Sequence, residues 1–319
     1  MRPIGGFFEL ELPRCGRPLH HDALALTSGR ACLALLLRQS RPRRALLPFY
    51  TCDAVIDAFA AAAVPVTFYG LTDLFAPDLA DIPAADECLL YINYFALQEP
   101  TVAQLMRDFG SRLVVDDAQA FFTARAPLSW SFNSARKFFG VPDGAYLRGP
   151  ITASETFAPN DAVRVDHLLH RMRGDLARGF AEHQDHERSF TLDVFGMSRV
   201  AGALLQNVDY GAVADRRRRN FAALDGRLRR HNRLPVEPGA QSIVPFCYPL
   251  LPAGDVSHED LWQHHIFAPR LWPEVVSRRA PGFARERELA SLLLPLPIDH
   301  RYGEDDMMRV ADVIEELIA

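Results

Sequence analysis

The sequence predicts an α/β protein: a three-layer large domain with a mostly parallel sheet, followed by a smaller C-terminal α+β domain. From residue 45 to residue 119, short apolar runs alternate with helical segments, as expected for a sheet with crossover helices. The runs are continuously apolar, which is typical of strands covered on both faces. The 319 residues with 49% hydrophobic content are enough for a second, smaller unit. We expect residues 1–208 to form the large domain and residues 209–319 the small one.

The first helix of this pattern is apolar, and a short polar turn precedes it. Thr27 or Ser28 can cap the helix over residues 31–37. The free N–H groups at Ser28, Gly29 and Arg30, together with the positive end of the helix dipole, would suit an anion. An ordinary N-cap is the alternative, since every helix needs one.

Polar residues follow the next strands. We expect strands over residues 45–48, 64–69, 88–94 and 113–115, with helices over residues 50–63 and 101–109 between them. Asn93, Asp116 and Gln119 stand at the ends of these strands. Ligands of parallel sheets bind beyond the carboxyl ends of strands, so these side chains and Ser28 are expected to converge on one crevice.

The second half of the chain is more polar. Residues 153–195 are helical in pattern, and His183 and His186 are spaced i, i+3. No carboxylate motif accompanies them, so a solvated helix is expected and no metal site is predicted. Arg216–Arg219 falls in a long helix over residues 208–231, where four successive side chains encircle the axis and would be solvated. A final helix is expected over residues 305–318.

Composition excludes several classes of function. The formal net charge of −5 argues against a general nucleic-acid binder. No run of 18 apolar residues predicts a membrane span, and the N-terminus lacks the apolar core of a signal peptide. Cys15, Cys32, Cys52, Cys88 and Cys247 form no CxxC pair, which indicates reduced thiols, a cytoplasmic protein and no zinc site.

Lys137 is the only lysine among the 35 basic Lys and Arg residues. Arginine can replace lysine on most surfaces but not as a nucleophile, because its guanidinium stays protonated. Phe132, Phe138 and Phe139 surround Lys137 in the sequence, and burial among them would favour the neutral amine that forms a Schiff base with an aldehyde. The alternative is a lysine without a function, present by chance, whose ammonium group lies in solvent.

An anion site, an acidic strand end and a lysine follow one another along the chain. A pyridoxal phosphate (PLP) enzyme needs three such groups. N–H groups bind the phosphate, a carboxylate contacts the pyridine nitrogen, and an amine reacts with the aldehyde. Asp116 and Lys137 would supply the last two.

In this order and spacing, the sequence resembles the DegT/StrS-type sugar aminotransferases, which have the aspartate aminotransferase-like fold (fold type I of PLP-dependent enzymes). The matching segments are Thr27–Arg30 (phosphate turn), Leu47–Thr51, Val114–Gln119 (acidic motif), Ser131–Lys137 (lysine loop) and Leu294–Ile298. The resemblance implies PLP as cofactor.

The resemblance also implies roles for individual residues. Lys137 would form the internal aldimine and then act as general acid and base, and Asp116 would hold the pyridine nitrogen protonated. Gln119 would contact the ring oxygen. The remaining cofactor-binding candidates are Ser28, Gly29, Arg30, Cys52, Asn93, Ser134 and, more weakly, Ser131.

Two segments differ from the family pattern. Cys52 stands where the family has an aromatic residue that stacks on the cofactor ring. Val194–Ser198 lacks the Asn and Arg of the family's Asn-Tyr-Arg-Met-Ser segment, of which the Asn reaches the partner subunit's phosphate.

The expected function is therefore a cytoplasmic, homodimeric PLP-dependent aminotransferase that acts on a nucleotide-linked keto sugar with an amino donor. Another PLP-dependent reaction, such as elimination or decarboxylation, and a non-catalytic binding protein remain alternatives. The apolar arm over residues 5–8 could dock on the chain's own sheet or across a two-fold axis.

Overall fold

A computed structural model describes residues 12, 16–151, 155–236 and 243–318. Its main feature is an eight-stranded sheet with the order β1-β8-β7-β6-β5-β2-β3-β4. The four neighbouring pairs from β7 through β6, β5 and β2 to β3 are parallel, whereas β8, β1 and β4 add antiparallel pairs at the two edges. The predicted mostly parallel α/β sheet is confirmed.

The strands follow the apolar runs of the sequence. They span Leu24–Leu26 (β1), Ala45–Pro48 (β2), Val66–Leu71 (β3), Pro77–Asp78 (β4), Cys88–Ile92 (β5), Leu113–Asp117 (β6), Trp130–Asn133 (β7) and Ala145–Arg148 (β8). All residues of β2, β5, β6 and β7 are buried, because helices or loops cover both faces of the central sheet.

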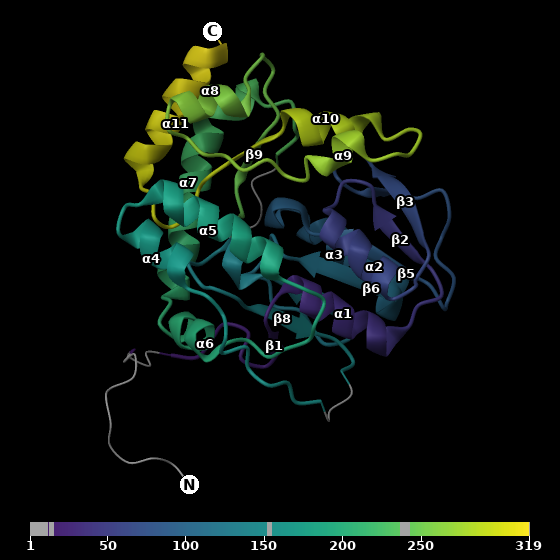
Figure 1. The fold of residues 1–319 in the computed structure, drawn as a ribbon. Helices are drawn as coiled ribbons and strands as arrows, with labels where there is room; N and C mark the ends of the chain where they lie inside the picture. Colours follow the sequence, from purple (N-terminus) through teal and green to yellow (C-terminus); the bar gives the residue numbers. More distant parts are fainter. Residues whose placement is uncertain (1–11, 13–15, 152–154, 237–242, 319) are drawn as a thin grey trace, which may run out of the picture.

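Three helices connect the strands of the first half: α1 (Gly29–Ser40), α2 (Asp53–Ala61) and α3 (Glu99–Phe109). Figure 1 shows them on the sheet, with α1 and α2 side by side. The α1 helix contacts β7 and β8, and α3 contacts β6. Each helix begins directly beyond a strand, so its N-terminus lies near the carboxyl edge of the sheet.

A helical hairpin of α4 (Asp166–Met172) and α5 (Leu176–Ser189) follows, and then α6 (Arg199–Gln206). The expected solvated helix is wrong in one respect. His186 is only 5% exposed, and its ring stacks on His167 at 4.6 Å. No cluster of three potential metal ligands occurs in the described residues.

The C-terminal part is a small α+β assembly. It contains α7 (Tyr210–Leu228), α8 (His258–Gln263), α9 (Glu274–Ser277), α10 (Ala284–Leu292) and α11 (Glu304–Ile318), with an antiparallel pair of β9 (Tyr248–Leu250) and β10 (Leu294–Leu296). In Figure 1 these elements lie above the sheet, with α11 beside α7. The division at residue 208 stays a prediction.

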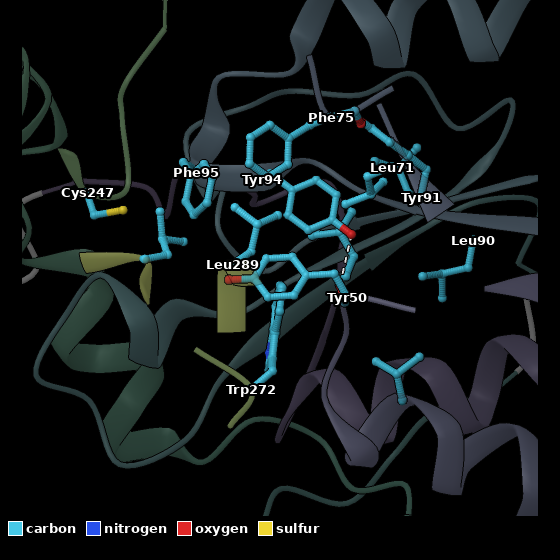
Figure 2. Packing of buried hydrophobic residues seen from close by; sticks show 14 of the residues in the cluster. Tyr50, Leu71, Phe75, Leu90, Tyr91, Tyr94, Phe95, Cys247, Trp272 and Leu289 are labelled. Carbon is cyan, nitrogen blue, oxygen red and sulfur yellow. Dashed lines mark hydrogen bonds between the residues drawn. The ribbon is translucent and has the colours of Figure 1, made fainter. Parts of the chain in front are cut away.

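The two parts share one hydrophobic core. Tyr50, which follows β2, packs edge-on against Trp272 at 4.6 Å, and Tyr94 donates a hydrogen bond to the Tyr50 carbonyl at 2.9 Å (Figure 2). Phe49 stacks on Phe283 at 4.2 Å. These contacts hold the C-terminal elements against the end of the sheet where β2 stops.

The long helix α7 contains the four-arginine run, and the expectation that all four are solvated is wrong. Arg219 is exposed, but Arg217 is 1% exposed and is among the largest fully buried side chains of the described residues. The apolar arm over residues 5–8 lies outside the described residues. No helix in the described part of the chain is long and apolar enough to cross a bilayer.

Candidate active site at the carboxyl edge of the sheet

The α1 helix begins at this edge with a free N-terminus. Ser28 is the N-cap, and its Oγ accepts a hydrogen bond from the Ala31 N–H at 3.1 Å, as predicted. Neither the Gly29 nor the Arg30 N–H has a hydrogen bond to an acceptor in the described part of the chain. These two donors and the positive end of the helix dipole make the turn suitable for a phosphate.

The two neighbouring aspartates of β6 point to opposite faces of the sheet. Asp117 lies on the α3 face, where Arg125 donates to both of its carboxylate oxygens and Glu99 of α3 also contacts Arg125. Asn93 belongs to the same network, because its Nδ2 donates to Asp117 at 3.1 Å and to Glu99 at 2.5 Å.

Asp116 lies on the other face, that of α1. Its charge raises the pKa of Cys32, a residue of α1 whose thiol pKa is raised above all by burial. Burial raises the pKa of Asp116 itself to about 6, while the positive charge of Lys137 opposes this shift. Asp116 and Lys137 therefore lie within electrostatic reach of each other, and Asp116 is on the side of the sheet that α1 covers.

Cys52 lies at the same place, at the N-cap position of α2. Burial raises the pKa of its thiol, Lys137 lowers it and Asp116 raises it, so the sulfur lies within electrostatic reach of both groups. The structure thus brings together Asp116, Lys137 and Cys52, three residues that are far apart in the sequence.

Gln119 is fully buried, and one end of its amide has no partner. Its Oε1 accepts the Phe95 N–H at 2.7 Å, which fixes the orientation of the amide. Nε2 is therefore a buried donor without a hydrogen-bond partner in the described residues. Phe95 has a left-handed backbone with φ 60°, which a residue with a side chain adopts only when its surroundings enforce it. Gln119 Nε2 is therefore held in a fixed orientation and can donate a hydrogen bond to an acceptor oxygen of a ligand.

The lysine loop forms a short 3-10 turn over Ala135–Lys137. Ser134 precedes it and makes no side-chain capping hydrogen bond, so its hydroxyl is uncommitted there. Phe138 and Phe139 turn into an apolar cluster with Phe121. The expected burial of Lys137 is wrong: the residue is exposed, because successive residues of a 3-10 turn point about 120° apart.

Two predicted cofactor-binding residues are not brought to this group. Asn93 uses its side chain in the Asp117 network, and its Oδ1 accepts the Gln98 N–H at 3.1 Å. Ser131 pairs with Val115 in the register of β6 and β7, next to Phe132, which pairs with Asp116. Side chains alternate along a strand, so Ser131 points to the face opposite Asp116.

Thr51 ends the family-like segment Leu47–Thr51, but it was not among the predicted cofactor-binding residues. It is 0% exposed, and its Oγ1 has no hydrogen-bond partner in the described residues. The carbonyl of Thr51 accepts a hydrogen bond from Arg278 at 2.8 Å, and Arg278 also binds Asp53 at 2.7 Å. The signal was its position between β2 and α2, where a polar residue at a strand end meets the crevice.

The segment Val194–Ser198 lies against the phosphate turn of its own chain. Thr27 N–H donates to the Phe195 carbonyl at 3.1 Å, and Ser198 Oγ donates to Asp143 at 2.6 Å. A Cβ on Gly196 would lie 2.9 Å from the Phe157 carbonyl oxygen, so only glycine fits there. In this chain the segment therefore supports the turn that carries Ser28.

Solved structures with this fold are similar over nearly the whole chain. A DegT DnrJ EryC1 StrS aminotransferase from Brucella abortus aligns with 93% of this chain and 86% of its own (TM-score 0.65, 16% identity). NtdA from Bacillus subtilis, solved with bound cofactor PMP, aligns over 93% and 73% (TM-score 0.67, 12% identity). The sugar aminotransferase CalS13 from Micromonospora echinospora aligns over 92% and 87% (TM-score 0.60, 19% identity).

These likenesses confirm the expected fold, that of the DegT/StrS-type aminotransferases. No protein-family model matches the sequence, and no curated protein matches it.

Proposed function

We propose that this protein is a PLP-dependent aminotransferase. The observation that supports the proposal is that the buried Asp116 carboxylate lies within electrostatic reach of the single lysine, Lys137, on the side of the sheet covered by α1, whose N-terminus has free N–H groups. The structural neighbours with this fold are aminotransferases, and one was solved with bound PMP.

The residues present fit the cofactor. Gly29 and Arg30 offer N–H groups for its phosphate, and the Ser28 hydroxyl belongs to the same turn. Ser134 follows Asn133, whose carbonyl oxygen would lie 3.9 Å from a Cβ on Gly29. The unpartnered Nε2 of Gln119 is a donor for a ring oxygen, and the unpartnered Thr51 hydroxyl is a second buried group that a ligand would satisfy. Cys52 contributes a sulfur rather than an aromatic ring to the wall beside Asp116.

When bound, PLP supplies an aldehyde that forms a Schiff base with an amine and a pyridinium ring that withdraws electrons. Asp116 lies in a buried site, where its carboxylate would stabilise a proton on the ring nitrogen. Lys137, within electrostatic reach of Asp116, would take up a proton from the carbon that bears the donor's amine and, in the second half-reaction, deliver a proton to the acceptor carbon.

We further propose a keto sugar, carried on a nucleotide, as the acceptor, because similar structures include sugar aminotransferases. A two-fold homodimer in the cytoplasm completes the proposal. In the dimer, a group of the partner chain would replace the Asn that is missing from Val194–Ser198. Arg188 and Arg199, which pair here with Asp185 and Asp161, are candidates for that role.

The half-reaction with an amino donor tests this function. PLP-loaded protein mixed with L-glutamate or L-glutamine should lose its absorbance at the violet edge of the visible and release a stoichiometric amount of the keto acid. Bound PLP with a stable spectrum and no keto acid from any amino acid would contradict transamination and favour a binding protein or a different PLP reaction.

A further inference from the structure

A cavity of about 390 Å³ opens beside Lys137, between the lysine loop, the α4–α5 hairpin and the loop that follows β10. Its charged wall is predominantly basic and includes Lys137, Arg171, Arg217, His300 and Arg301. The acidic residue of the wall is Asp299, which makes two hydrogen bonds with the Arg301 guanidinium, at 2.6 and 2.9 Å. Asp299 therefore pairs directly with Arg301, and its charge also acts on Arg217 and His300, whose pKa values burial lowers and Asp299 raises. One carboxylate still faces several basic groups on this wall.

Three of these cations have no acidic partner within 4.0 Å in the described part of the chain: Lys137, Arg171 and Arg217. Arg217 is the unusual one, because it is 1% exposed. A buried guanidinium with no carboxylate in contact is destabilising, since the protein interior solvates its charge poorly. Burial lowers the pKa of Arg217 to about 10, which still leaves it protonated at neutral pH.

The hydrogen bonds of Arg217 leave part of its guanidinium unused. Nη1 donates to the carbonyl oxygens of Pro245 and Phe246, at 3.3 and 3.0 Å. The guanidinium carbon lies 4.6 Å from the ring centre of Phe138, the residue next to Lys137. Nε is buried and has no hydrogen-bond partner in the described residues.

His300 offers a second unused group on the same wall. Its Nδ1 is buried and also lacks a partner among the described residues. The ring centres of His300 and Phe139 lie 6.0 Å apart, which places His300 on the lysine-loop side of the cavity. Two residues from distant segments, each with an unpartnered nitrogen atom, thus line one cavity with an excess of positive charge.

We propose that Arg217 and His300 form an oxyanion subsite beside Lys137, which binds a carboxylate or phosphate group of the substrate. An oxyanion would accept hydrogen bonds from the guanidinium and the imidazole and would neutralise the buried charge. The assignment of the ligand as substrate rests on the proposed function; the subsite itself rests on the cavity. It is separate from the N-terminus of α1, and it lies within this chain.

A purely structural Arg217 is the competing explanation, since Nη1 also braces residues 245–246. Such a brace would make anion affinity independent of Arg217. Binding of small anions to the PLP-loaded protein distinguishes the two, because the cofactor fills the phosphate turn at Ser28. Isothermal titration with succinate and, separately, with pyrophosphate gives the two affinities without requiring turnover.

We expect wild-type protein to bind at least one of these anions with a stoichiometry of one. The Arg217→Gln substitution should lower the affinity for that anion at least tenfold, the usual effect of losing a charge-assisted hydrogen bond. Arg219→Gln, an exposed substitution two positions along the same helix, should bind as wild type. If succinate binding depends on Arg217, the subsite is assigned to the carboxylate of the amino donor. If pyrophosphate binding depends on Arg217, the subsite is assigned to a phosphate of the acceptor.

If Arg217→Gln does not fold, His300→Gln provides the test instead. This variant should lower the affinity for the same anion. Failure of the wild type to bind either anion, or unchanged affinity in both variants, would overturn the proposal. Lys137→Ala separates it from the proposed function, since that variant loses covalent cofactor attachment, whereas any anion binding that remains should still depend on Arg217. A protein that never attaches PLP, yet binds an anion through Arg217, would refute the aminotransferase and leave the subsite standing.

Discussion

Asp116 and Asp117 are neighbours of identical chemistry on opposite faces of β6, and their substitution by Asn should have opposite effects on stability. Asp116 is a buried carboxyl whose pKa is raised from 3.8 to about 6, with burial as the largest cause. The folded protein therefore binds this proton more tightly than the unfolded chain. Its stabilising contribution is complete below pH 4 and is lost as the pH rises towards 6 and above.

The magnitude follows from that shift. At pH 7 the ionised Asp116 disfavours the cofactor-free fold by about 3 kcal/mol. Asp116→Asn removes the charge but keeps the shape, so cofactor-free Asp116→Asn should be more stable than wild type at pH 7, and this difference should shrink as the pH falls from 6 to 4. With PLP bound, the same variant should lose on the order of 10²–10³-fold in turnover, because the pyridine nitrogen loses its charged partner.

Asp117→Asn acts on the Arg125 network instead. The side chains of Asp117 and Arg125 are each 5% exposed, and removal of one partner from a buried ion pair costs about 3–5 kcal/mol. We expect about 3 kcal/mol, because Glu99 still contacts Arg125 at 2.9 Å. Turnover per folded molecule should stay close to that of wild type.

Urea unfolding of the cofactor-free proteins at pH 4, 5, 6 and 7 measures the free energies of unfolding, and steady-state assays measure turnover. Wild type is the reference in both. An Asp117→Asn protein that is inactive but stable, beside an active Asp116→Asn protein, would show that the assignment of the two faces is reversed.

Two further predictions concern the cofactor and the assembly. Gln119→Glu keeps an acceptor for the Phe95 N–H but removes the unpartnered Nε2 donor, so PLP affinity should fall at least tenfold in a fluorescence titration; an unchanged affinity would exclude Gln119 from the site. Sedimentation should show a homodimer, and we expect its interface to contain the pocket at the lysine loop (Ser131–Lys137). A monomer that retains bound cofactor would contradict that prediction.

The sequence predicted what depends on local pattern. Continuous apolar runs located the parallel strands at whose ends Asp116 and Gln119 stand. The N-cap at Ser28 was also visible, because capping needs only residues adjacent in the chain.

Other features depend on contacts between distant segments, which no local pattern contains. Lys137 is exposed because Phe138 and Phe139 pack on Phe121, and the sequence does not show which side of the turn that cluster occupies. Arg217 differs from Arg219 only in the surface that each faces. Its carbonyl partners at Pro245 and Phe246 are nearly thirty residues away. The missing partner of Gln119 Nε2 likewise becomes visible only once the Phe95 backbone is placed.

The most direct test of the central claim uses the single lysine of the chain. Purified protein is incubated with PLP, reduced with borohydride, digested and analysed by mass spectrometry. We predict one phosphopyridoxyl group per chain, attached to Lys137, and no adduct in Lys137→Ala. A Lys137→Ala protein that still forms a borohydride-reducible adduct, or a wild-type protein that forms none at saturating PLP, would contradict the assignment.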